Sequence, residues 1–170
     1  NVINAKRQTD GTIIHTTDDG DKTRYLDIRG GLSWAGGSPT DSAPHYFCIV
    51  GQEWTPKPFE GQKRQKGKLR LITEYESGGL MGRTDFFRRM TDDAKRLHCT
   101  DFYADVRETE SETNPHNEAF QKYLRDNAIT PGIYMQQAPY VDNFLFGLHE
   151  INALREQNLI DIADSKAHEQ

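Results

Sequence analysis

The stretch that decides the fold spans residues 69–106 and reads LRLITEYESGGLMGRTDFFRRMTDDAKRLHCTDFYADV. Its first part, residues 69–75, alternates apolar and polar side chains in the way that a half-buried β-strand does. Residues 85–97 then place apolar side chains at helical spacing, and residues 101–106 return to a strand pattern. A strand, a helix and a strand in this order predict a helix that packs on a sheet.

The helix over residues 85–97 is expected to bury one face. The members of that face are Phe86, Phe87, Met90, Ala94 and Leu97. Thr84 is the predicted N-cap, because a threonine oxygen can accept a hydrogen bond from a free N–H of the first turn.

Outward from this unit, the remaining elements follow from the same patterns. Strands are predicted at 24–27, 45–51, 129–135 and 159–162, and helices at 117–127 and 140–157. An antiparallel meander is expected from the strands at 24–27, 45–51 and 69–75. Strand-helix units follow this meander. The order predicts an α/β fold in which helices flank a mixed sheet.

Length and charge bound the function. The chain has 170 residues, which suits one domain, with 1–23 as a linker or peripheral hairpin and 24–170 as the domain proper. Its formal net charge of −5 argues against a globally basic nucleic-acid-binding protein, although a local basic patch is compatible with it. No phosphate loop GxxxxGK[ST], no GxGxxG, no GxSxG and no HExxH motif is present.

The apolar and cysteine patterns point to the cytoplasm. No apolar run is long enough to span a membrane, and the N-terminus lacks the apolar core of a signal peptide. Cys48 and Cys99 have no zinc-site spacing, so we expect two reduced thiols in an intracellular protein without a membrane partner.

Acidic side chains lie at or near the ends of three predicted strands: Asp27, Glu74 and Asp105. An aspartate in an apolar strand is unfavourable unless it is paired or bound to a cation. Because the ends of adjacent strands converge in a mixed sheet, we expect Asp27 and Asp105 to lie together, with Glu74 or Glu76 as a weaker third member. Such carboxylates suit Mg²⁺ or Mn²⁺. Two ions about 4 Å apart would activate a water for phosphodiester hydrolysis.

The strand order and the acids Asp27 and Asp105 resemble the ribonuclease H-like fold and, within it, the nuclease domain of viral large terminases. The sequence YLDIRGG at 25–31 is similar to that family's first strand, in which an aspartate precedes a turn of small residues. The sequence FYADVR at 102–107 is similar to its second acidic strand. Residues 140–162 resemble its long helix and the short strand that follows.

The resemblance covers residues 24–170 and implies a metal-dependent endonuclease that cleaves double-stranded DNA during viral genome packaging. It implies that Asp27 and Asp105 are catalytic and bind two Mg²⁺ or Mn²⁺ ions, with Glu74 assisting. The implied partners are double-stranded DNA, the ATPase domain of the same motor protein, and the portal or the small terminase subunit. The implied location is the cytoplasm of the host cell.

This sequence departs from the family at its third acid. In the family that residue lies on a helix beyond the last short strand, and this chain ends at Gln170, near where such a helix would begin. Asp164 and His168 lie nearest to that position but come too early in the chain. Asp142 and the pair His149 and Glu150 lie in the predicted long helix and are weaker candidates. We therefore expect one domain of a larger protein, without an assigned third ligand.

A cationic segment between two strands suits a DNA substrate. It contains Lys57, Lys63, Arg64, Lys66, Lys68 and Arg70 against one acid, Glu60. A loop of this charge can contact a phosphate backbone, although a solvated hairpin loop would look the same in sequence.

Two alternatives keep the fold and change the function. The first is a ribonuclease H-like nuclease acting on an RNA–DNA hybrid or on branched DNA. The second is a non-catalytic DNA-binding or motor-docking domain with an incomplete site.

Overall fold

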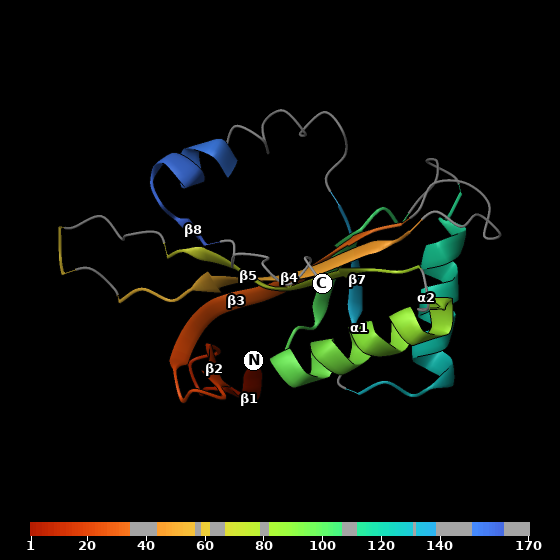
Figure 1. The fold of residues 1–170 in the computed structure, drawn as a ribbon, viewed down its shortest axis with the longest axis horizontal. Helices are drawn as coiled ribbons and strands as arrows, with labels where there is room; N and C mark the ends of the chain where they lie inside the picture. The colour runs from red at the N-terminus through yellow and green to blue at the C-terminus, as the bar shows by residue number, and fades with distance from the viewer. Residues whose placement is uncertain are drawn as a thin grey trace, which may run out of the picture.

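The computed structural model describes residues 1–34, 44–56, 59–61, 67–78, 82–106, 112–130, 132–138 and 151–161. Within these residues, eight strands form one mixed sheet. The long helix α1 (Arg83–Leu97) lies against one face of the sheet, and α2 (Pro115–Asp126) lies at its end (Figure 1). The predicted fold class, a mixed sheet of meander and strand-helix units flanked by helices, is confirmed.

The meander consists of β3 (Lys22–Ser33), β4 (Tyr46–Glu53) and β5 (Leu69–Glu76), which pair antiparallel. Strand β3 is much longer than the predicted strand at 24–27. Residues 29–33, which the glycines favoured as loop, extend it because β4 pairs with one edge and β6 (Asp101–Ala104) with the other. Tertiary pairing therefore overrides the low strand propensity of two glycines.

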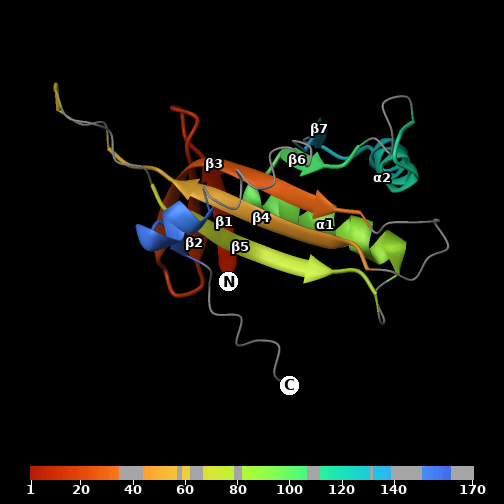
Figure 2. The ribbon, with the colours of Figure 1, turned by 90° about the horizontal axis from the view of Figure 1, so that it is seen from above.

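One edge of β3 is shared by two neighbours. Its first half pairs antiparallel with β2 (Ile13–Thr17), which also pairs with β1 (Val2–Arg7). Its second half pairs parallel with β6, and β6 pairs parallel with β7 (Tyr134–Gln137). Figure 2 shows β6 and β7 beside the C-terminal half of β3 and the hairpin of β1 and β2 beside its N-terminal half.

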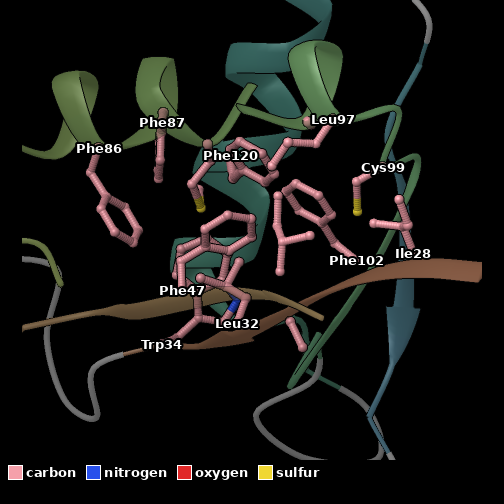
Figure 3. Close-up of a cluster of buried hydrophobic side chains, with 14 of the residues drawn as sticks. Ile28, Leu32, Trp34, Phe47, Phe86, Phe87, Leu97, Cys99, Phe102 and Phe120 are labelled. Atoms are coloured by element: carbon pink, nitrogen blue, oxygen red, sulfur yellow. The ribbon is translucent and has the colours of Figure 1, made fainter. Parts of the chain in front are cut away.

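Helix α1 packs its apolar face into the core. Its predicted apolar face is confirmed, since Phe86, Phe87, Met90, Ala94 and Leu97 are all buried. The predicted cap is wrong: Thr84 lies inside the helix, and Gly82 is the N-cap without any side-chain hydrogen bond. Figure 3 shows side chains of α1, α2 and the strands pointing into one cluster.

The remaining helices and strands overlap their predicted ranges where they are described, with shifted ends. Helix α2 begins two residues earlier than expected, with the Asn114 side chain accepting from the backbone N–H groups of His116 and Asn117. Strand β7 begins at Tyr134, five residues later than predicted. Of the predicted helix over 140–157, residues 151–156 are described and helical.

The C-terminal part adds one strand to the sheet. Strand β8 (Ile160–Asp161) pairs parallel with β5, and residues 151–158 lie near it on the face opposite α1 (Figure 1). None of the helices in the described part of the chain is long and apolar enough to cross a membrane.

The parallel pair of β3 and β6 depends on a contact between a glycine and a ring. A Cβ atom on Gly30 would lie 2.5 Å from the Phe102 ring, which is itself fully buried. We expect Gly30→Ala to lower the free energy of unfolding by about 1–3 kcal/mol through overpacking. Urea unfolding measures this, and Gly30→Ala combined with Phe102→Leu should recover part of the loss. A double variant no more stable than Gly30→Ala alone would contradict the proposed clash.

Candidate functional site

Asp105 lies where two parallel strands end. Leu32 of β3 pairs with Ala104 of β6, so Asp105, the next residue, is level with Ser33, the last residue of β3. Gln137 ends β7 beside them. We call this place, made of Ser33, Asp105 and Gln137, the carboxyl edge. In sheets with parallel strands, ligands bind outside the carboxyl ends of the strands, so the carboxyl edge is the first place to expect chemistry.

Asp105 is exposed and held from one side. The carboxamide Nε2 of Gln137 donates to Asp105 Oδ1 at 3.3 Å, and the backbone N–H of Val106 donates to Gln137 Oε1 at 3.1 Å. Gln137 is not among the site residues predicted from the sequence. No local sequence pattern indicates a role for Gln137, because only the pairing of β6 with β7 places this residue beside Asp105.

Asp27 lies far from the carboxyl edge. It precedes Arg29, the residue that pairs with Asp101, and stands six residues before Ser33 along β3. At about 3.3 Å per residue, the backbones of Asp27 and Asp105 are roughly 20 Å apart. The prediction that these two acids converge is therefore wrong, because β6 pairs with the second half of β3 and Asp27 lies in the first half.

The carboxylate of Asp27 already has a basic partner. Arg29 Nε donates to Asp27 Oδ2 at 2.5 Å, and Arg29 also donates to the hydroxyl of Tyr103 at 3.0 Å. The hydrogen bond to Asp27 is the main cause that raises the pKa of Arg29. The arrangement ties β3 to β6 through side chains on the exposed face of the sheet, which is a structural use of Asp27.

Glu74 lies on the face of the sheet opposite α1, in a cavity of about 680 Å³. The cavity is lined by Gly31, Leu32, Ser33, Tyr46, Phe47, Cys48, Glu74, Tyr75 and Glu76. The hydrogen bond to Glu76 raises the pKa of Tyr46, and burial raises the pKa of Cys48. The cavity therefore holds two carboxylates, with an aromatic hydroxyl beside one of them.

Glu76 is level with Asp105 but three strands away. The pairing runs from Glu76 through Tyr46 to Ser33, the residue beside Asp105. At about 4.8 Å per strand, this is roughly 14 Å between backbones. Glu74 precedes Glu76 by two residues in β5, so it lies even farther from Asp105.

The carboxylates do not form the two-ion centre that the sequence predicted. In the described ranges, no three His, Cys, Asp or Glu side chains lie close enough together to hold a metal ion. Asp27 is separated by distance and by its ion pair with Arg29. Asp105 is the one acid of the predicted set that the fold places at the carboxyl edge.

The predicted DNA-binding residues divide into two groups. Lys57, Lys63, Arg64 and Lys66 lie outside the described residues. Lys68 is exposed beside the start of β5, whereas Arg70 forms an ion pair with Glu53 of β4. The charge of Arg70 is thus offset within the sheet, and of the two described members Lys68 is the exposed one that can contact a phosphate.

A buried cluster of imidazole and indole rings consists of Trp34, His45 and His116. Trp34 directly follows β3, and His45 directly precedes β4. The ring centroids of His45 and His116 are 4.6 Å apart, and Trp34 stacks near His116 at 6.2 Å. His116 lies in the first turn of α2 and is only 3% exposed. Asn114 and Pro115 were the local signals for a helix start there.

This cluster makes stability depend on pH. Burial, with the nearby charges of His116 and Arg83, lowers the pKa of His45 from 6.5 to about 4. Because the unfolded chain binds more protons than the folded one between these values, stability should fall as the pH falls from 6.5 to 4. We expect a loss of up to about 3 kcal/mol from His45. Thermal unfolding across this range tests it, and His45→Phe should flatten the slope. An equal slope in both proteins would contradict the assignment to His45.

Comparison with known proteins finds a distant likeness among solved structures. No protein-family model matches the chain. No curated protein matches it either. Among solved structures, it is similar to the large terminase nuclease from the thermophilic phage G20c, solved with bound magnesium. The sequences are 10% identical, the match covers 98% of this chain and 70% of that one, and the TM-score is 0.47. A likeness of this size assigns neither residues nor a function to the chain.

Proposed function

We propose that this chain is a nuclease domain that hydrolyses phosphodiester bonds of double-stranded DNA during viral genome packaging. The observation that carries the proposal is the position of Asp105, an exposed acid directly after β6 and level with the end of β3. The motif FYADVR, which contains Asp105 and resembles the second acidic strand of viral large terminase nucleases, supports the same reading.

The acids present require a cation for this reaction. Asp105 is exposed and places a negative charge at the carboxyl edge. A phosphodiester, which is itself an anion, is repelled by such a surface. We therefore propose Mg²⁺ or Mn²⁺ as the cofactor and assign Asp105 alone as a residue that faces it. No catalytic role is given to Asp27 in this proposal.

The proposed partners follow the same reading. They are double-stranded DNA, the ATPase domain of the same motor protein, and the portal or small terminase subunit, in the cytoplasm of the host cell. Lys68 is the described cation that we propose for contact with the DNA backbone.

The test is cleavage of supercoiled plasmid by the purified chain at millimolar Mn²⁺, with a chelator as the matched control. We expect nicked and linear plasmid with Mn²⁺ and none with chelator. Absence of metal-dependent cleavage on double-stranded DNA, on an RNA–DNA hybrid and on branched DNA would overturn the nuclease proposal.

One observation favours a second candidate, a non-catalytic DNA-binding or motor-docking domain. Asp27 is paired with Arg29 and lies roughly 20 Å from Asp105, so the two acids cannot share an ion. Binding of a cation to the folded state raises the melting temperature by mass action. A chain that binds DNA but shows neither cleavage nor a melting shift at millimolar Mn²⁺ would support the second candidate.

A further inference from the structure

Gln137 makes three side-chain hydrogen bonds at the carboxyl edge. Its Nε2 donates to Asp105 Oδ1 at 3.3 Å and to the backbone oxygen of Ala138 at 3.1 Å. Its Oε1 accepts from the backbone N–H of Val106 at 3.1 Å. One carboxamide therefore spans from β7 to both residues that follow β6.

The contact with Val106 decides which end of the carboxamide faces Asp105. A backbone N–H can only donate, so the atom that it meets must be the carboxamide oxygen. The other end is then the NH₂ group, and it faces the Asp105 carboxylate. Because the Val106 N–H occupies the oxygen of the Gln137 carboxamide, the NH₂ group of Gln137 is the donor to Asp105.

The backbone on both sides of this contact is held in place. Ala138 N–H donates to Ala104 O at 2.8 Å, which extends the pairing of β7 with β6 past Gln137. The carbonyl of Val106 accepts from Asn114 N–H at 3.0 Å, at the start of α2. Side chains mounted on fixed strands hold a reactive group more accurately than side chains on loops do.

We propose that Gln137 is the positioning residue of Asp105: it orients the carboxylate that the nuclease reaction uses. The catalytic part of this proposal rests on the proposed function, whereas the contact itself does not. Gln137 touches no substrate in this role and acts only through Asp105. Its neighbour Gln136 is exposed on the same strand and serves as the matched control.

The first experiment measures plasmid cleavage with Mn²⁺. We expect Gln137→Met to lower kcat about 10- to 100-fold, the usual cost of losing a residue that orients an active-site group, with KM for DNA unchanged. Gln136→Met should change neither quantity. In an Asp105→Asn background, Gln137→Met should cause no further loss, because the two residues act as a unit. Equal losses in both backgrounds would show a merely structural role and would overturn the proposal.

The second experiment does not depend on activity. The side-chain NH₂ signals of Gln137 in an ¹⁵N-labelled chain report directly on its hydrogen bonds. We expect these signals to shift in Asp105→Ala and to stay in place in Asp27→Ala. Unchanged signals in Asp105→Ala would overturn the positioning role. If the signals shift but the chain cleaves no DNA, the hydrogen bond between Gln137 and Asp105 is supported and the proposed nuclease function is wrong.

Discussion

Asp105→Asn is expected to lower the Mn²⁺-dependent rate of plasmid cleavage by about 100-fold or more, the scale on which the loss of a catalytic side chain acts. The substitution keeps the size of the side chain and removes its charge. Asp105 is exposed, and its described side-chain contact is the hydrogen bond from Gln137, so the fold should persist. Initial rates at saturating DNA, with circular dichroism to verify folding, measure the effect.

Asp27→Asn is the matched control for this prediction, because it makes the same chemical change on the neighbouring strand. Asp27 pairs with Arg29 and lies roughly 20 Å from Asp105, so its cleavage rate should stay within about threefold of the wild type. Its stability should change by no more than about 1 kcal/mol, as for other exposed ion pairs. If Asp27→Asn abolished cleavage and Asp105→Asn did not, the assignment of chemistry to the carboxyl edge would be wrong.

Phe102→Ala is expected to lower the free energy of unfolding by about 3–5 kcal/mol. The Phe102 side chain of β6 is 0% exposed, its ring centroid lies 4.9 Å from that of Phe47, and it stacks on Phe120 at 6.2 Å (Figure 3). Gly30 presents no side chain to it, so the ring fills the space between β3 and the helices. Removal leaves a cavity and loosens β6, the strand that carries Asp105. Urea unfolding measures the loss.

Phe59→Ala provides the comparison at an exposed site. Phe59 is 86% exposed, so the same deletion should change the free energy of unfolding by less than about 0.5 kcal/mol. Similar losses in both variants would mean that burial of Phe102 is not what holds β6 in the sheet.

Local elements were predictable because their signals are local. Apolar spacing along one helix face defined α1 from Phe86 to Leu97, and that face is buried as predicted. Alternation defined β5, and the acid Asp105 was correctly placed at the end of a strand. These features depend on residues within a few positions of one another, which is what periodicity and capping patterns measure.

Helix boundaries were less predictable for a related reason. Thr84 has the chemistry of an N-cap, yet α1 begins before it, after Gly82. Burial of Phe86 and Phe87 against the sheet stabilises the first turn without a side-chain cap. Packing of an amphipathic face contributes more to helix stability than capping does.

The candidate site depends on pairing register, which no local pattern encodes. From sequence, Asp27 and Asp105 are equivalent acids on neighbouring strands, and convergence was a reasonable expectation. The long strand β3 pairs first with β2 and then with β6, and this division leaves Asp27 in the first half while Asp105 follows the second. Gln137 reaches Asp105 for the same reason, since β7 pairs with β6.

Composition and periodicity thus predicted the fold class, the main helices and strands, and an acid at the end of β6. The distances among the acids, the ion pair of Asp27 with Arg29 and the contact of Gln137 with Asp105 arose only in the folded chain. The physical reason is that register is selected by burial across strands distant in sequence. The close fit of Phe102 over Gly30 is such a contact, and it aligns β6 with the second half of β3.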